Sequence, residues 1–158
     1  MSSARPVSDQ EMLARYVLSG SWLYKDGRER PLKPNAWLPH PRIELSVFRT
    51  DGWHESNVVE QGERVASERE DKHRRKMLHE GREYPEEKTT FRYLGRGEIL
   101  AREVRSCGLD VLPKEPPPCH ADIVQWPPLT GNRKHDESAQ MAYALKLAAC
   151  CSFIPALP

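Results

Sequence analysis

The chain has 158 residues, of which 38% are hydrophobic and 30% are charged. This composition excludes an intrinsically disordered protein, and a chain of this length suits a single domain with a sizeable core. Its 24 lysines and arginines nearly balance its 23 aspartates and glutamates, so the net charge of +1 gives no overall attraction to nucleic acid or to anionic lipid.

The sequence shows no signal for a membrane. The first twenty residues lack the uninterrupted apolar core of a signal peptide, and the apolar run near the C-terminus is shorter than the ~20 residues that cross a bilayer. We therefore expect a soluble, cytoplasmic protein. In that reducing compartment the four cysteines, which have no C-x-x-C spacing, are expected to be free thiols.

The first predicted element is a short helix over residues 9–18. Ser8 and Glu11 have the spacing of a capping box, in which each side chain satisfies a free N–H group of the first turn. Apolar residues follow at helical spacing in residues 12–17, and Gly20 is a typical helix end.

A proline-rich arm follows over residues 21–41. Its four prolines impose extended or turn geometry, and Asp26-Gly27 is a turn signal. The arm is therefore predicted to be irregular, with a possible small hairpin. Trp22 and Trp37 are expected to anchor it.

The clearest strand lies in RIELSVFR, residues 42–49, where apolar and polar side chains alternate. Residues 54–70 are predicted to form a helix, although Gly62 weakens it by roughly 1 kcal/mol. From residue 60 to residue 88, eight basic residues stand among nine acidic ones. This pattern predicts a solvated helix face that continues into a mobile loop around Tyr84-Pro85.

Shorter elements fill the rest of the chain. Residues 89–95 have a β-rich composition, and the GRG stretch at 95–97 is interpreted as a turn. Residues 98–108 can form a strand, a short helix, or one after the other, and residues 109–113 look like a strand closed by proline. The last element is predicted to be an alanine-rich helix from Asp136 to about Ser152, capped by Asp136 or Ser138.

This order of elements indicates an α+β domain. We expect a small mixed or mostly antiparallel sheet, packed by two or three helices, with an irregular proline-rich arm. The single domain divides into an N-terminal helix and arm (1–42), a strand, helix, charged loop and further strands (43–113), a proline-rich bridge (114–135) and the C-terminal helix (136–152).

His120 and Asp122 are the first candidates for chemistry. Two residues apart on a strand, they share a face, so the aspartate could orient the imidazole for general acid/base catalysis. Arg49, at the end of the clearest strand, could hold a phosphate or a carboxylate. In one cleft, the three would suit a ribonuclease-like or nucleotide-handling site. The alternative is structural, with backbone hydrogen bonds for His120 and Asp122 and a surface ion pair for Arg49.

Cys119 is a poor candidate nucleophile, because neighbouring side chains on an extended chain point to opposite sides and His120 could not serve it. No close pair of cysteines or histidines has the spacing of a zinc site, so no metal and no other cofactor is expected. A basic stretch could contact nucleic acid, but acidic residues flank it, and a solvated helix is the main interpretation. That stretch consists of Lys72, Arg74, Arg75 and Lys76.

Three motifs stand out along the chain: SVFR at residues 46–49, GLDV at 108–111 and PPPCHADIVQWP at 116–127. Together they resemble a loose family of small bacterial proteins of uncharacterised function, with the pattern PPP-x-HA-x-I-x-x-WP. The resemblance spans roughly residues 37–150 and implies no activity. It departs from the family pattern at Cys119, where an arginine is expected, and at Gln125, where a glycine is expected. The cysteine argues against a thiol-based function for the group.

Four tryptophans and many prolines in a small chain without a complete catalytic set favour a non-enzymatic binding or adaptor module that docks a protein partner. Trp22, Trp37 and Trp53 are the candidate anchors, and they could equally lock the arm down. Two alternatives remain. One is a small RNA- or nucleotide-processing enzyme with His120 as general acid/base, and the other is a nucleic-acid-binding accessory protein.

Overall fold

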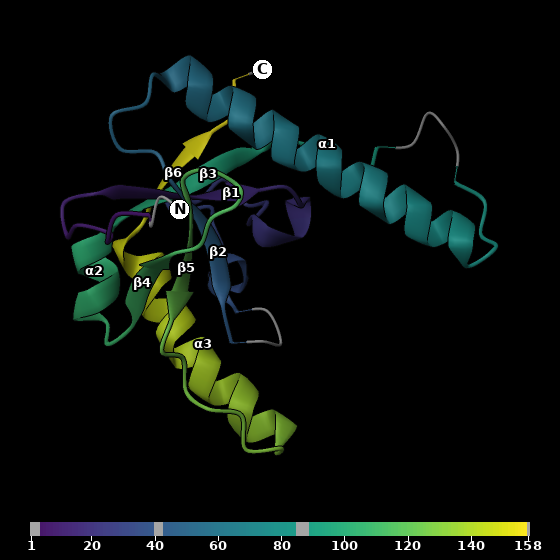
Figure 1. The fold of residues 1–158 in the computed structure, drawn as a ribbon. Coiled ribbons are helices and arrows are strands. Elements are labelled where there is room, and N and C mark those ends of the chain that lie inside the picture. Colours follow the sequence, from purple (N-terminus) through teal and green to yellow (C-terminus); the bar gives the residue numbers. More distant parts are fainter. Residues whose placement is uncertain (1–3, 40–42, 85–88, 158) are drawn as a thin grey trace.

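Six antiparallel strands form one sheet in the order β4-β5-β2-β1-β3-β6 (Figure 1). The structure is a computed structural model that describes residues 4–39, 43–84 and 89–157. Its strands are β1 (Met12–Val17), β2 (Leu45–Arg49), β3 (Gly95–Leu100), β4 (Asp110–Pro113), β5 (His120–Val124) and β6 (Ser152–Pro155). Its helices are α1 (Glu55–His79), α2 (Ala101–Ser106) and α3 (Arg133–Cys150), with two short 3-10 helices, η1 (Gly20–Trp22) and η2 (Pro34–Trp37). The predicted α+β fold is confirmed.

The main hydrophobic core lies between one face of the sheet and α3. Leu13, Val47, Ile99 and Ile123 come from four neighbouring strands and are almost completely buried in this core, and α3 contributes Leu147. Because successive side chains of a strand point to opposite faces, the residues between them face the other side of the sheet.

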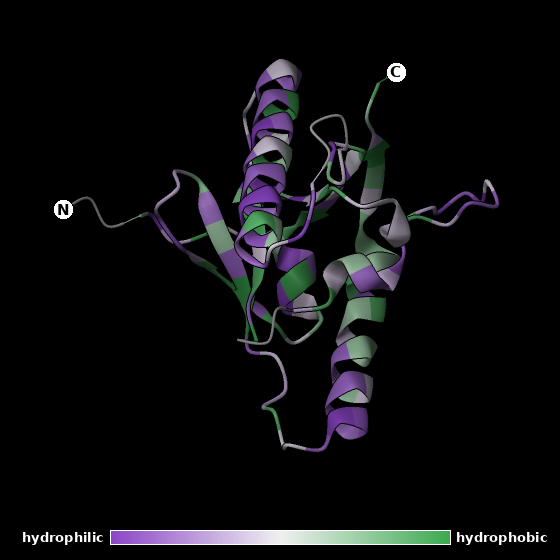
Figure 2. Cartoon of the chain, turned by 90° about the vertical axis from the view of Figure 1, so that its right-hand side faces the viewer, coloured by the Kyte–Doolittle hydropathy of each residue, from purple (hydrophilic) through white to green (hydrophobic). Residues whose placement is uncertain are grey.

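A smaller apolar cluster holds α1 against that other face. It joins Tyr16 and Phe48 from the sheet to Val58 and Ala66 from α1, and the Tyr16 hydroxyl donates a 2.8 Å hydrogen bond to the Val58 carbonyl. The C-terminal half of α1 extends past the sheet (Figure 1), and Figure 2 shows mostly hydrophilic residues along this helix. The sheet therefore holds α1 mainly by the N-terminal part of the helix.

Gly62, which weakens a helix in isolation, is explained by this packing. A Cβ atom at Gly62 would lie 2.9 Å from the Tyr16 ring and 3.1 Å from the Tyr93 ring. The glycine therefore allows α1 to approach the sheet closely. The helix continues through the charged segment to His79, in agreement with the solvated helix face predicted there, and Tyr84 is tied back to it by a hydrogen bond to Glu70. Pro85 lies outside the described residues.

The helix predicted over residues 9–18 is wrong, because residues 12–17 form β1. This strand lies in the interior of the sheet, between β2 and β3, and both of its faces are covered. Leu13 and Val17 face the main core, while Ala14 and Tyr16 face α1. A strand that is buried on both faces loses the alternating pattern, and its apolar residues then imitate helical spacing.

The arm contains the predicted hairpin. Leu23 and Leu32 form an isolated antiparallel bridge, and backbone hydrogen bonds of 2.7 Å join the Tyr24 N–H to Pro31 and the Lys33 N–H to Trp22. The second half of the arm, with η2, packs against α3.

The GRG stretch at 95–97 begins β3 and is not a turn. Gly97 pairs with Arg15 of β1, and a Cβ atom at Gly97 would lie 2.8 Å from the Trp37 ring. The glycine is therefore a packing requirement of the strand. Residues 98–108 form a strand followed by a short helix, which was one of the predicted options, and the predicted strand over 109–113 is confirmed as β4.

The last helix, α3, begins at Arg133, earlier than predicted, and ends at Cys150, so Ser152, the predicted end of the helix, begins β6 instead. Its N-cap is Asn132, whose side chain accepts a 3.1 Å hydrogen bond from the His135 N–H, so neither Asp136 nor Ser138 is the cap. Asp136 instead accepts hydrogen bonds from the preceding loop at Thr130. The proline-rich bridge begins in the hairpin between β4 and β5. The Lys114 N–H closes the tip of this hairpin by donating a 2.9 Å hydrogen bond to the His120 carbonyl.

Gln125 has a φ of 69°, in the left-handed region that glycine occupies without strain. This is the position at which the resemblance described above leads us to expect a glycine. Because the Gln125 side chain is exposed, its loss removes little packing. We expect Gln125→Gly to raise the free energy of unfolding by up to about 1 kcal/mol, measured by urea denaturation. Gln61→Gly, within α1, is the control and should destabilise the protein by a similar amount. A destabilised Gln125→Gly variant would contradict the assigned backbone conformation.

Candidate binding site

His120 and Asp122 share a face of the sheet, as predicted, but they do not act as a pair. In the register of β2 and β5, His120 lies opposite Phe48 and Asp122 opposite Ser46. The His120 Nδ1–H donates a 3.0 Å hydrogen bond to the Lys114 carbonyl, and the buried Asp122 carboxylate lies 3.3 Å from the Lys114 ammonium. The imidazole is therefore oriented by a backbone carbonyl of the hairpin.

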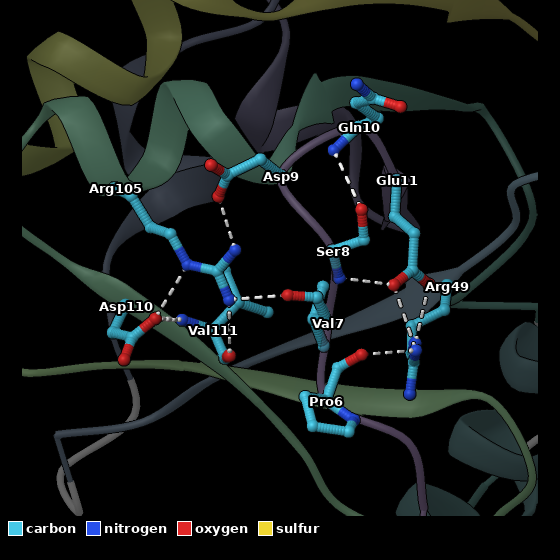
Figure 3. A network of polar contacts seen from close by, with 10 residues as sticks. All are labelled: Pro6, Val7, Ser8, Asp9, Gln10, Glu11, Arg49, Arg105, Asp110 and Val111. Carbon is cyan, nitrogen blue, oxygen red and sulfur yellow. Dashed lines mark hydrogen bonds and ion pairs between the residues drawn. The ribbon is translucent and has the colours of Figure 1, made fainter.

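Arg49 is directed away from His120. It follows Phe48 on β2, so its side chain faces the opposite side of the sheet from the His120 ring, which packs edge-on against Phe48. Arg49 donates hydrogen bonds of 2.8 and 2.9 Å to the two Glu11 carboxylate oxygens and one of 3.3 Å to the Pro6 carbonyl (Figure 3). The structure therefore does not bring Arg49, His120 and Asp122 into one cleft.

Arg49 and Arg105 together hold the N-terminal segment, residues 5–11, against the sheet. Arg105 donates to Asp9 at 2.6 Å, to the Val7 carbonyl at 2.7 Å and to Asp110 at 2.9 Å (Figure 3). The hydrogen bond from Arg105 lowers the pKa of Asp110. The expected anion clamp at Arg49 is thus satisfied by the protein's own carboxylate, and the arginine has a structural role.

Glu11 belongs to the same network and keeps part of the predicted capping box. Its carboxylate accepts a 2.6 Å hydrogen bond from the Ser8 N–H, but the chain makes a turn there and then enters β1. Burial raises the pKa of Glu11, but hydrogen bonds from Arg49 and Ser8 outweigh this effect, so the pKa lies below its ordinary value.

The lowered pKa of Glu11 predicts a loss of stability in acid. A carboxylate whose pKa is depressed on folding contributes stability above the unfolded pKa, about 4.3, and this contribution disappears as the pH falls through the folded pKa. We expect the free energy of unfolding, measured by urea denaturation from pH 7 to pH 3, to fall less steeply in Glu11→Gln than in the unmodified protein. Glu63→Gln, at an exposed position of α1, is the matched control. Equal pH profiles for Glu11→Gln and the unmodified protein would contradict the assignment.

The candidate anchors Trp22, Trp37 and Trp53 differ in their exposure. Trp37 has no exposed surface and belongs to the main core, so it locks the arm down and cannot contact a partner. Trp22 and Trp53 are partly exposed. Trp22 also lies beneath a cation, because the Arg15 guanidinium carbon is 5.0 Å from its ring centroid. Among the three candidate anchors, Trp22 thus combines a partly exposed ring with a neighbouring arginine.

A cavity of about 480 Å³ is lined by residues of the arm, α1, the strands β1 and β2, and the hairpin between β4 and β5 that carries His120. We call it the arm–helix cavity. Its walls are mainly apolar and aromatic. The charged residues at it are Arg15, Arg69, Glu44 and Glu68, and His120 lies at it as well. Its other lining residues are Tyr16, Leu18, Trp22, Leu38, Pro39, Leu45, Ser46, Phe48, Val65 and Pro117. The volume falls within the range of ligand sites, about 300–1,000 Å³.

Arg15 is the residue of this cavity that sequence reasoning missed. It reaches the cavity from the interior strand β1, where its Nε donates a 3.0 Å hydrogen bond to the Ala36 carbonyl and its Nη1 a 3.1 Å bond to the Ser46 carbonyl. Burial lowers the pKa of Arg15 to about 10, and repulsion by Arg69 contributes to the decrease. The available signal was a single arginine within the apolar stretch MLARYVL, residues 12–18.

The basic stretch of α1 lies on the part of the helix that extends past the sheet. Lys72, Arg75 and Lys76 are exposed, whereas Arg74 is partly buried, with its guanidinium carbon 5.2 Å from the Tyr84 ring centroid. The exposed Asp71 interrupts the stretch, as expected for a solvated helix.

No metal site or membrane span is found in the part of the chain that the structure describes. No group of three or more His, Cys, Asp or Glu side chains there is arranged to hold a metal ion, and the four cysteines, including Cys119, are free thiols. None of the described helices is long and apolar enough to cross a membrane. Comparison of the chain with protein-family models, curated protein sequences and solved structures gives no match.

Proposed function

We propose that the protein is a non-catalytic binding module and that a segment of a partner protein docks in the arm–helix cavity. The observation that carries the proposal is the open cavity itself, with aromatic and aliphatic walls that include Trp22, Leu38 and Phe48. Interfaces are typically anchored by buried aromatic and arginine side chains, and this cavity presents both kinds.

The positions of the expected catalytic residues support a binding role over an enzymatic one. General acid/base catalysis needs the proton-transferring groups within hydrogen-bond reach of one substrate atom. His120 is at the arm–helix cavity, whereas Arg49 lies on the other face of the sheet in an ion pair with Glu11. A nucleic-acid-binding role is supported by the exposed cations on the extended half of α1, which neighbouring acidic residues offset.

The proposal is tested by site-specific photo-crosslinking. A photoreactive benzophenone amino acid is placed at Leu38, which lines the cavity, or at Leu145, a 53% exposed residue of α3 that serves as the control. We expect the Leu38 variant, but not the Leu145 variant, to form one specific adduct in cells that express the protein. The captured protein, once purified, should bind the unmodified chain at least tenfold more tightly than a Leu38→Glu variant. Adducts at both positions, or equal affinities, would contradict docking in the cavity.

A further inference from the structure

We infer that the docked segment carries a carboxylate side chain next to an apolar one, and that Arg15 and Arg69 bind this carboxylate inside the arm–helix cavity. The inference rests on the proposed docking function and specifies the chemistry of the occupant. Three observations support it: the hydrogen-bond and ion-pair partners of the two arginines, the other charged residues at the cavity, and the apolar walls.

Arg15 has hydrogen-bond donors to spare. Its two hydrogen bonds go to the neutral carbonyls of Ala36 and Ser46. A guanidinium has five N–H donors, so three of them have no partner among the described residues. A planar guanidinium with adjacent free donors matches the two oxygens of a carboxylate, and the low polarity around it strengthens such a pair.

Arg69 brings a second positive charge to the same cavity from α1. Its guanidinium carbon lies 5.0 Å from the Phe91 ring centroid, which orients the side chain without neutralising it. In the described ranges, neither Arg15 nor Arg69 forms an ion pair with a carboxylate. Two like charges at one cavity repel each other, and an anion between them would relieve this repulsion.

The acidic residues around the cavity have partners or surroundings of their own and do not pair with Arg15. Glu44 shares the Lys114 ammonium with the buried Asp122, at 2.9 Å and 3.3 Å. Glu68 and Arg69 are both exposed to solvent on α1, so their opposite charges offset each other there. The Arg15 donors that have no partner among the described residues therefore favour an anion over a cation.

The apolar walls distinguish a peptide segment from a free anion. Trp22 lies under the Arg15 guanidinium, and Leu38 and Phe48 line the same space. A small inorganic anion would leave these walls exposed to water, whereas a glutamate or aspartate beside a leucine or phenylalanine covers them while it reaches the arginines. We therefore commit to an acidic–apolar peptide segment.

The test compares two capped peptides, Ac-Leu-Phe-Glu-Leu-NH2 and Ac-Leu-Phe-Gln-Leu-NH2, titrated into the 15N-labelled full chain and followed by NMR. We expect the glutamate peptide to shift the side-chain Nε–H signal of Arg15 and the amide signals of residues around the cavity. The glutamine peptide, which has the same shape but no charge, should bind at least tenfold more weakly. Arg69→Gln, at an exposed position that the fold tolerates, should reduce this discrimination. Arg15→Met should abolish it, and a preserved backbone spectrum would show that this variant folds.

Each other outcome overturns the inference in a recognisable way. Equal binding of both peptides at the cavity would leave docking intact and refute the carboxylate. Binding of acetate at matched ionic strength as tightly as the glutamate peptide would indicate a free-anion site. Tighter binding of a phosphoserine peptide would assign the arginines to phosphate. If neither peptide shifts the cavity signals, the acidic–apolar segment is refuted, and the crosslinking experiment separately decides whether any partner docks there.

Discussion

Trp37→Ala is expected to lower the free energy of unfolding by about 3–5 kcal/mol, the range for removing a fully buried aromatic side chain. Trp37 has no exposed surface and belongs to the main core, between the arm, α3 and β3. Its removal leaves a cavity and weakens the attachment of the whole arm. Because a domain of this size is stable by about 5–15 kcal/mol, the loss is a large part of the total.

Urea denaturation followed by far-UV circular dichroism measures this loss. Trp53→Ala is the matched control. Trp53 is the same residue type, but it is partly exposed and packs against the smaller cluster, so its removal should lower the free energy of unfolding by clearly less. Equal losses for the two variants, or a loss below about 1 kcal/mol for Trp37→Ala, would contradict the position of Trp37 in the core.

Gly97→Val is expected to destabilise the protein by about 1–3 kcal/mol, although valine is a better strand former than glycine. A Cβ atom at Gly97 would lie 2.8 Å from the Trp37 ring and 2.9 Å from the Leu32 side chain. These distances are too short, so both neighbours would have to move inside a packed core.

A double-mutant cycle shows whether this contact is the cause. In a Trp37→Leu background the ring is gone, so Gly97→Val should cost at least about 1 kcal/mol less than it does in the unmodified chain. Additive effects of the two substitutions, measured by the same urea denaturation, would mean that the glycine and the tryptophan do not meet.

The sequence predicted the fold class because most elements have local signals. RIELSVFR alternates as a half-buried strand, and β2 is found over its residues 45–49, whereas Ile43 lies in a turn with a φ of 57°. The charged segment has the composition of a helix, and the second half of α1 is found there. The failure at β1 has a tertiary cause, because a strand covered on both faces carries no alternation. The same holds for GRG, where the packing of Trp37 against Gly97 explains the glycine, and this contact joins segments far apart in the chain.

For the candidate site, the sequence predicted which residues share a face of a strand, but not which groups they contact. Spacing placed His120 and Asp122 on one face of a strand, which the pairing of β2 and β5 confirms. Their hydrogen-bond partner, Lys114, could not be foreseen, because the hairpin that brings it back is set by backbone conformation. Arg15 was overlooked because its interest as a binding residue depends on the absence of a carboxylate partner among the described residues, and only the folded structure shows this.

The arm–helix cavity connects these observations. The Gly62 contact lets α1 approach the sheet, and Trp37 fixes the arm. The space left between the arm and α1 is lined by Trp22, Leu38 and Phe48 beside Arg15. The residues that stabilise the fold therefore also shape the proposed docking site. Substitutions of Trp37 should weaken binding together with stability, whereas Arg69→Gln should weaken binding alone.

The most direct test of the docking proposal is a set of intermolecular nuclear Overhauser effects between the protein and the bound Ac-Leu-Phe-Glu-Leu-NH2 peptide. Docking in the arm–helix cavity predicts contacts from the leucine methyl groups of the peptide to the rings of Trp22 and Phe48, with the glutamate methylene protons close to the Arg15 side chain. Contacts that instead involve exposed residues outside the cavity, such as Leu145 of α3, would contradict it.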